Sequence, residues 1–327
     1  MSSRKLHVVT AIANPMRYAS RDRLLERWLR KMIDAGTQVT VVELVYDDRI
    51  TVTDRILDKL AEARVERRHH GVDFVPVRTR DVMWHKEDLI NLGFAHLPHD
   101  WRYAAWVDAD VEFHRPGWDN ATIDQLNLHA VVQCWSHAQD LDPQHRPVHG
   151  ARMAKSFMAA YRDGDVTGSG RYDDHNWHPG YAWAIRRDAY EDLGGLLDVA
   201  ILGAGDRHMA MSLVGKGHLS YPGKVSDGYK RAVLGWQERA EAHIHRNVGV
   251  VDGMITHWWH GPKRNRRYAD RWQILVRNHF DPATDLREDR DSRLWRWART
   301  DTPRMRNLRD EVRAYFRARD EDSTEAS

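Results

Sequence analysis

Two carboxylates one residue apart, Asp108 and Asp110, follow an apolar run over residues 104–107. If this run is a buried strand that continues into the pair, both side chains point the same way, because residues i and i+2 of a strand share a face. The carboxyl end of a strand in an open α/β sheet is where ligands bind. Paired carboxylates suit a hard divalent cation, Mg²⁺ or Mn²⁺, which often also holds a diphosphate. We therefore expect a cation at Asp108 and Asp110.

Two histidines late in the chain, His257 and His260, are further candidates for metal ligands. Imidazole binds borderline metals alongside carboxylates. On a regular strand these two side chains would point to opposite faces, so we expect only one of them to reach the cation. The basic run that follows, residues 263–267 with Lys263 at its start, is suited to a diphosphate or to the backbone of an acceptor. A solvated basic loop is the alternative.

A glycine-flanked acid, Asp206, opens a predicted helix over residues 206–215. A carboxylate at that place lies near backbone N–H donors and the positive end of the helix dipole. Asp206 is therefore an N-cap, a general base that takes a proton from an alcohol, or both. Earlier in the chain, Lys86 lies in the first turn of a predicted helix over 85–97, and Asn91 lies inside it. Asparagine has a poor helix propensity, so Asn91 indicates either a specific contact or a solvated face.

Apolar runs at residues 6–12, 38–45, 73–78 and 104–107 alternate with helical patterns in the first third of the chain. This order predicts an α/β protein whose central sheet is mostly parallel, with helices on both faces. We expect a main domain over residues 1–284 and an Arg-rich helical extension over 285–319. The acidic, Ser/Thr-rich end, residues 320–327, is predicted to be a disordered tail.

The composition narrows the function classes. Charged residues make up 30% of the 327, yet the net charge is only +2, so the overall charge does not indicate a nucleic-acid-binding protein. Residues 261–277 are locally basic, with six basic side chains and one acid. The one cysteine excludes an intramolecular disulfide and zinc-finger spacing. No apolar run is long enough to span a bilayer, and no signal peptide precedes the first strand, so we expect a cytoplasmic protein that does not contact membranes. P-loop, dinucleotide-binding and nucleophile-elbow motifs are missing from the sequence.

The order of these motifs resembles that of GT-A glycosyltransferases, in particular the β-1,4-galactosyltransferase group, over roughly residues 5–262. The segments that carry the resemblance are Lys86 with Leu89-Ile90-Asn91-Leu92-Gly93-Phe94, Trp106-Val107-Asp108-Ala109-Asp110, Pro179-Gly180-Tyr181-Ala182-Trp183-Ala184-Ile185, Leu193-Gly194-Gly195, Gly203-Ala204-Gly205-Asp206 and a late histidine. The chain departs from the group in having a single acid at Asp206, followed by Arg207 and His208. It also has no secretory anchor and lacks the cysteines of the Golgi enzymes.

The resemblance implies a GT-A (Rossmann-like) fold and a metal-dependent transfer, inverting at the sugar carbon, from a nucleotide sugar, with a UDP-sugar expected, to an acceptor hydroxyl. Asp206 matches the position of the acceptor-side acid and would be the catalytic base. The cation, Mn²⁺ or Mg²⁺, would be bound by Asp108 and Asp110 together with one of His260 and His257. Donor binding is expected at Asn91, Lys86, Arg78, Asp108, Asp47 and Lys263, and acceptor binding at Trp183, Gly205, His178 and Arg207.

The chain also resembles intracellular phage-type glycosyltransferases, some of which are similar to TET-associated enzymes that modify 5-hydroxymethylcytosine in DNA. The segments concerned are Val132-Gln133-Cys134-Trp135-Ser136-His137-Ala138-Gln139-Asp140-Leu141, His178-Pro179-Gly180, His260-Gly261-Pro262-Lys263 and Tyr268-Ala269-Asp270-Arg271-Trp272. This likeness implies a bacteriophage enzyme in the host cytoplasm and double-stranded DNA with a hydroxymethylated base as partner. Alternatives are a saccharide or other small acceptor, a nucleotidyltransferase, and a non-catalytic nucleic-acid-binding protein.

Overall fold

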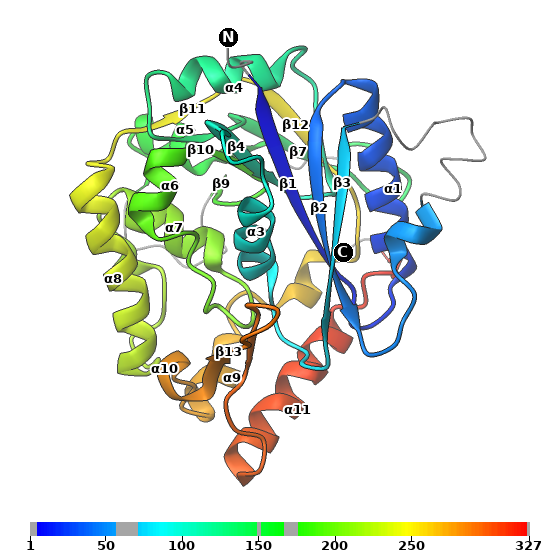
Figure 1. Cartoon of the computed structure of the whole chain (residues 1–327), viewed down its shortest axis with the longest axis vertical. Coiled ribbons are helices and arrows are strands. Elements are labelled where there is room, and N and C mark those ends of the chain that lie inside the picture. Colours follow the sequence, from blue (N-terminus) through cyan, green and yellow to red (C-terminus); the bar gives the residue numbers. More distant parts are fainter. Residues whose placement is uncertain (1–4, 57–70, 149–151, 167–175, 326–327) are drawn as a thin grey trace.

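The computed structural model describes residues 5–56, 71–148, 152–166 and 176–325. These residues form a layered α/β structure around a central sheet (Figure 1). No helix in these ranges combines the length and the apolar composition that crossing a bilayer requires.

The central sheet of the described residues has seven strands in the order β11-β6-β10-β4-β1-β2-β3. All run parallel except β10, which is antiparallel to both of its neighbours. The strands are β1 (Leu6–Ala13), β2 (Gln38–Tyr46), β3 (Val72–Thr79), β4 (Tyr103–Val107), β6 (Val131–Gln133), β10 (Ala182–Arg186) and β11 (Val248–Val250). The predicted mostly parallel sheet is confirmed.

Alternate residues of the central strands point to opposite faces of the sheet and pack into two hydrophobic cores, one on each face. In β1, for example, Val8 packs into one core and Val9 into the other, and both are fully buried. The core around Val8 is covered by α1 (Ala19–Asp34) and α4 (Trp118–Leu126). The core around Val9 is covered by α3 (Lys86–Ala95), α5 (Phe157–Arg162), α6 (Arg187–Leu193), α7 (Gly205–Leu213), α8 (Asp227–His243), α9 (Trp272–Arg277) and α11 (Pro303–Ala318). Helices therefore cover both faces, as predicted (Figure 1).

A second sheet brings two polar side chains together. Its strands, in the order β5-β12-β7-β8-β9, are β5 (Val111–Phe113), β12 (Met254–His257), β7 (His137–Asp140), β8 (Ala154–Ser156) and β9 (Trp177–His178). In the parallel pair of β12 with β7, His257 lies opposite Asp140, and β5 begins directly after the Asp108–Asp110 segment. The register of this sheet thus places His257 near the acids that follow β4.

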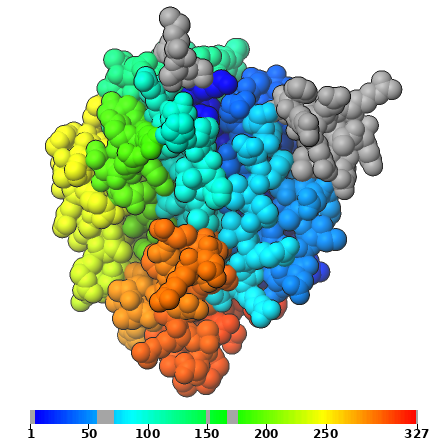
Figure 2. All heavy atoms as spheres, in the orientation of Figure 1, coloured from blue at the N-terminus to red at the C-terminus, as the bar shows by residue number. Residues whose placement is uncertain are grey.

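The C-terminal segment from Pro282 to Ala318 packs onto the core that contains Val9, and in Figure 2 its orange and red surface adjoins the cyan part of the chain. It contains α10 (Pro282–Asp285), β13 (Leu286–Glu288), β14 (Trp295–Trp297) and α11; the short helices η1 (Gly217–Leu219) and η2 (Lys263–Arg266) lie earlier in the chain. The boundary between a 1–284 domain and a 285–319 extension stays a prediction. The predicted disorder from residue 320 is wrong for 320–325, because Glu321 is 3% exposed and ion-paired to Arg21 and Arg319.

Candidate functional site

A cavity lies at the carboxyl ends of β1 and β4, the edge of a parallel sheet where ligands bind. Its walls come from segments far apart in the chain: the residues after β1, the turn after β4, the starts of α3 and α7, and the end of α11. Its polar lining consists of Asn14, Tyr18, Arg21, His85, Lys86, Asp108, Asp110, His178, Tyr181, Asp206, Arg207, His257, His260, Arg266, Tyr268, Arg271, Arg319 and Glu321.

Asp108 and Asp110 lie in this cavity but have different partners. The chain from Asp108 to Asp110 is a turn between β4 and β5, not a continued strand, and the Asp108 N–H donates to the Tyr181 carbonyl at 2.8 Å. The Asp108 carboxylate forms an ion pair with Lys86 Nζ at 2.6 Å. Asp110 instead faces the two histidines. The expectation that a strand would aim both acids at one spot is wrong, because the turn rotates them apart.

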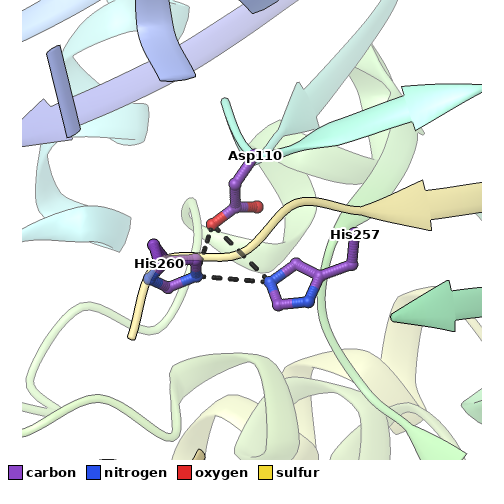
Figure 3. Close-up of side chains that lie close together, drawn as sticks. All are labelled: Asp110, His257 and His260. Carbon is purple, nitrogen blue, oxygen red and sulfur yellow. Dashed lines mark hydrogen bonds and ion pairs between the residues drawn. The ribbon is translucent and has the colours of Figure 1, made fainter. Parts of the chain in front are cut away.

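Asp110, His257 and His260 converge on one point (Figure 3). Asp110 Oδ2 lies 3.0 Å from His260 Nε2 and 3.9 Å from His257 Nε2, and the two Nε2 atoms are 3.2 Å apart. Both histidines are buried. We expected only one of them to point here, but β12 ends at His257 and the non-strand segment after it brings His260 back. Both histidines therefore belong to the cluster.

The hydrogen bonds around this cluster fix where the lone pairs lie. His257 Nδ1 is 2.9 Å from an Asp140 oxygen, and since a carboxylate only accepts, the ring donates there and keeps a lone pair on Nε2. Arg266 donates to His260 Nε2 at 2.9 Å, so that atom carries a lone pair as well. Burial, with Arg266 beside it, lowers the pKa of His260 to about 3, so the ring is neutral at pH 7.

Two imidazole lone pairs and a carboxylate oxygen that face one point repel each other unless a cation lies between them. Cis ligands of an octahedral ion at about 2.1 Å are about 3.0 Å apart, close to two of the three spacings seen here. The two imidazole nitrogens favour a transition-metal ion over Mg²⁺, and the carboxylate oxygen suits a hard member of that series such as Mn²⁺. In addition, Asp110 Oδ1 is buried without a hydrogen-bond partner among the described residues. The donor set therefore fits a divalent cation.

A separate carboxylate, Asp206, lies across the cavity from this cluster. It belongs to the first turn of α7, which follows Ala204 in the left-handed region (φ 87°). Lys86 Nζ bridges the two acids, at 3.1 Å from Asp206 and 2.6 Å from Asp108. Burial lowers the pKa of Lys86, but the surrounding carboxylates outweigh it and hold that pKa above its ordinary value. The ammonium thus stays charged and orients Asp206.

Gly180 leaves room for Asp206. A Cβ at this position would lie 2.7 Å from Asp206 Oδ2, closer than real Cβ atoms approach, and 3.1 Å from His178 Cε1, which is tighter than most real contacts. We expect Gly180→Ala to displace the Asp206 carboxylate and to lower kcat about 10- to 100-fold, because misplaced catalytic groups cost that much. Steady-state kinetics of sugar transfer would measure this. The matched control is Gly223→Ala, where an added Cβ meets nothing within 4 Å; an equal loss in both variants would contradict the account.

Asn91 does not line the cavity, so the structure does not place it at a donor site. Its Oδ1 accepts from Leu196 N at 2.8 Å and from the Tyr190 hydroxyl at 3.1 Å. Its Nδ2 donates to the Leu196 carbonyl and to Asp198, both at 3.1 Å. The polar residue inside α3 therefore ties that helix to the loop after α6, which contains Gly195.

We expect Asn91→Ala to destabilise the protein by about 2–3 kcal/mol while leaving the donor KM unchanged, because it leaves buried partners unsatisfied. Thermal unfolding and donor kinetics would measure the two effects. Asn120→Ala is the control, since the exposed Asn120 side chain of α4 hydrogen-bonds only Asp119, at 3.4 Å, among the residues that the structure describes. A raised donor KM without loss of stability would restore Asn91 to the donor site.

Three other residues that were expected to bind the donor lie outside the lining of the cavity. Arg78 and Asp47 do not line the cavity; Arg78 is exposed and donates to the Asp47 carbonyl at 3.0 Å. Lys263 Nζ lies 2.5 Å from Asp140, the acid that orients His257. None of the three lines the cavity.

Two of the four expected acceptor residues line the cavity. His178 stacks on Tyr181 with ring centroids 4.0 Å apart, and Arg207 lies at the start of α7. Trp183 belongs to β10 and packs into the core that contains Val9, and its Nε1 donates to the Pro179 carbonyl at 2.7 Å. Gly205 faces Glu87, which a Cβ would meet at 2.5 Å, so it serves close packing and not an acceptor.

The basic run after His260 is not an open phosphate track. Arg266 and Arg271 are buried and line the cavity. Lys263 pairs with Asp140 at 2.5 Å, and Arg277 pairs with Glu311 at 3.2 Å. The weaker contacts are Arg264 with Glu325 and Arg267 with Asp270. The local charge that suggested a DNA backbone is directed inward or paired, and it no longer supports that partner.

Several lining residues were missed from the sequence. Arg21 lies in α1, whereas Arg319 and Glu321 follow α11, almost 300 positions later. Arg21 Nη2 donates to Glu321 at 2.8 Å, and Arg319 Nε donates to the same carboxylate at 2.5 Å. Nothing in their local patterns distinguishes them from surface charges of helices, and only the tertiary fold brings them together.

Comparisons with known proteins give fold-level likenesses only. A scan against protein-family models and a search of curated proteins find no match. Among solved structures, the catalytic domain of Drosophila β1,4-galactosyltransferase 7 aligns at 12% identity and TM-score 0.30, over 65% of this chain and 62% of that one. A Desulfovibrio desulfuricans protein described as a nucleotide-diphospho-sugar transferase aligns at 9% identity and TM-score 0.36, over 96% and 98%. GalNAc-T7 with UDP, GalNAc and Mn²⁺ aligns at 10% identity and TM-score 0.42, over 95% and 55%.

Proposed function

We propose that this protein transfers a sugar from a nucleotide diphosphate sugar, with a UDP-sugar as the expected donor, to an acceptor hydroxyl, with Mn²⁺ or Mg²⁺ as cofactor. The observation that carries the proposal is the cluster of Asp110, His257 and His260, whose lone pairs face one point in the same cavity as a separate carboxylate, Asp206. One set of groups suits a cation and the other suits a proton transfer.

When bound, the cation would neutralise charge that develops on the leaving diphosphate. The protein side of the site supplies further positive charge: Arg21, Lys86, Arg266, Arg271 and Arg319 all line the cavity. Arg266 donates a hydrogen bond to His260 Nε2 at 2.9 Å. Its guanidinium can pair with a phosphate once that nitrogen has another partner. These side chains would bind and orient the donor.

Asp206 would act as the base of an inverting transfer. Its carboxylate takes the proton of the acceptor hydroxyl while that oxygen bonds to the anomeric carbon. The bond from the anomeric carbon to the diphosphate breaks, and its electron pair leaves with the nucleoside diphosphate. Lys86, 3.1 Å away, fixes the direction of the carboxylate, and Gly180 leaves the space it occupies. Proton transfer by a positioned carboxylate contributes about 10²–10⁴-fold.

The two other function classes find less support in the site. A nucleotidyltransferase usually needs a glycine-rich cationic loop after its first strand, but residues 14–18 contain no glycine, and the Asn14 side chain bonds Tyr18 instead. Of the six basic residues after His260, Arg266 and Arg271 are buried, and the half-exposed Lys263, Arg264, Arg267 and Arg277 are ion-paired. A non-catalytic nucleic-acid-binding protein would also have no use for the cluster of one partly buried carboxylate and two buried histidines.

Slow hydrolysis of nucleotide sugars tests the proposal without knowledge of the acceptor. We expect the purified protein to release nucleoside diphosphate from one member of a panel of nucleotide sugars, and to do so only with Mn²⁺ or Mg²⁺. Pyrophosphate-dependent exchange would indicate a nucleotidyltransferase. Salt-sensitive binding of DNA without any hydrolysis would support the binding protein.

The acceptor is the finer part of the proposal. With the active donor in hand, transfer to a saccharide panel is compared with transfer to a duplex that contains 5-hydroxymethylcytosine. Incorporation of sugar into the duplex would support the DNA-modifying enzyme of bacteriophage type. Incorporation only into a saccharide or another small acceptor would replace it.

A further inference from the structure

The two histidines of the cluster have unequal outer partners. His257 Nδ1 donates to an Asp140 carboxylate at 2.9 Å. His260 Nδ1 is buried and has no hydrogen-bond partner among the described residues. The carboxylate nearest to it is that of Glu321, whose Oε2 lies 3.9 Å away. Histidines that bind metals almost always donate their other ring N–H to an acceptor, so the open Nδ1 indicates a bond that forms in another state of the site.

Glu321 is itself firmly held as an acceptor. Arg21 Nη2 donates to it at 2.8 Å and Arg319 Nε at 2.5 Å. A third bond comes from Arg21 Nε, which donates to Oε2, the oxygen that faces His260. A carboxylate has about four lone-pair sites, so one remains for the His260 ring beyond the three bonds that Glu321 accepts.

The segment that carries Glu321 is seated directly on the histidine loop. A Cβ at Gly261, whose φ is 84°, would lie 2.8 Å from the Asp320 carbonyl and 2.9 Å from Glu321 Cα. On the other side, the Asp322 carboxylate accepts from the N–H groups of Ala19 and Ser20 at 2.9 and 2.7 Å. The backbone next to His260 and the start of α1 therefore fix where Glu321 can be.

We propose that Glu321 is the positioning carboxylate of His260. When the ring binds a cation through Nε2, its Nδ1–H turns to Glu321, as the Nδ1–H of His257 is already bonded to Asp140. The inference rests on the metal site of the proposed function and not on the sugar chemistry. Such outer partners typically change metal affinity about 10- to 100-fold.

Mn²⁺ affinity, measured by the EPR signal of the free ion, tests the proposal. We expect Glu321→Gln to weaken binding about 10-fold. Arg21 Nη2 and Arg319 Nε both donate to Oε1, so the amide oxygen of glutamine should take that place. The amide N–H₂ then replaces Oε2, which faces His260, and it cannot accept from Nδ1–H. Asp140→Asn should weaken Mn²⁺ binding similarly. Asp320→Asn is the matched control: it alters the exposed acid that directly precedes Glu321, at a positive φ (42°) that asparagine tolerates, and should bind Mn²⁺ as the wild type does.

Unchanged affinity in Glu321→Gln, or equal weakening in Asp320→Asn, would overturn the proposal. The wild-type protein gives an independent answer should the variant not fold. With Cu²⁺ in place of Mn²⁺, electron spin echo modulation reports on the remote nitrogen of each bound imidazole. We expect two remote nitrogens, both with the quadrupole couplings of hydrogen-bonded imidazole; one bonded and one free nitrogen would contradict Glu321 as partner.

The inference and the proposed function fail separately. If the protein binds Mn²⁺ and Glu321→Gln weakens it, but no nucleotide sugar is hydrolysed, the positioning role stands and the transferase does not. If hydrolysis depends on Mn²⁺ but Glu321→Gln binds the ion normally, the transferase stands and the positioning role falls.

Discussion

Replacement of Asp110 by alanine is expected to abolish measurable Mn²⁺ binding and to lower donor turnover by about 10³-fold or more, several kcal/mol in barrier height. Among the described residues, Asp110 is the carboxylate that forms a cluster with both histidines, so its loss leaves only the two imidazoles as protein donors there. EPR of free Mn²⁺ and release of nucleoside diphosphate would measure the two effects. Thermal unfolding would confirm that the variant is folded.

The neighbouring acid provides a matched control within the same turn. Asp108→Asn should keep Mn²⁺ binding within a few-fold, because Asp108 is paired with Lys86 at 2.6 Å and is not part of the cluster. If the two acids shared the cation equally, as their spacing in the sequence suggested, both variants would lose the ion. Loss of Mn²⁺ binding in Asp108→Asn alone would contradict the arrangement described above.

Replacement of Asp206 by asparagine is expected to lower kcat for sugar transfer about 10³-fold, within the range that general-base catalysis contributes. The amide has the size of the carboxylate, so the cavity should stay intact, but it cannot take the proton of the acceptor hydroxyl. Because Asp206 is not part of the cation cluster, Mn²⁺ affinity and the donor KM should change little. Initial rates at saturating donor, with acceptor varied, would separate these effects.

Asp188→Asn is the control for this substitution, since Asp188 is likewise an acid in the first turn of a helix but belongs to α6, away from the cavity. It should transfer sugar at the wild-type rate. Full turnover by Asp206→Asn would remove Asp206 as the base. A parallel fall in Mn²⁺ affinity would instead indicate that Asp206 helps to bind the cation.

Much of the fold follows from local patterns. Apolar runs that alternate with helices predicted the mostly parallel sheet, and the strands around β1 bury alternate residues in two cores, as such a sheet requires. The second sheet was less accessible from sequence, because strands such as β5 and β9 have only two or three residues. Their existence depends on pairing with distant strands, so no local signal marks them.

The site was predictable where residue type determines the chemistry and not where geometry does. The sequence identified five candidates that all line the cavity: Lys86, Asp110, Asp206, His257 and His260. It did not predict which of them contact one another, because the turn after β4 and the loop after β12 determine those contacts. Asn91 was assigned to the donor because a polar residue inside a helix suggested a ligand, but its contact is another loop of the protein. Glu321 was assigned to a disordered tail because its neighbours are acidic and polar, although Arg21 and Arg319 bury it.

Diffraction from crystals soaked with Mn²⁺ and UDP, recorded near the manganese absorption edge, would test the central claim most directly. We expect one strong anomalous peak within coordination distance of Asp110 Oδ2, His257 Nε2 and His260 Nε2, with the diphosphate of UDP bound to the same ion. A peak held by Asp108 and not by the histidines, or UDP bound in the cavity without any anomalous peak, would contradict the account.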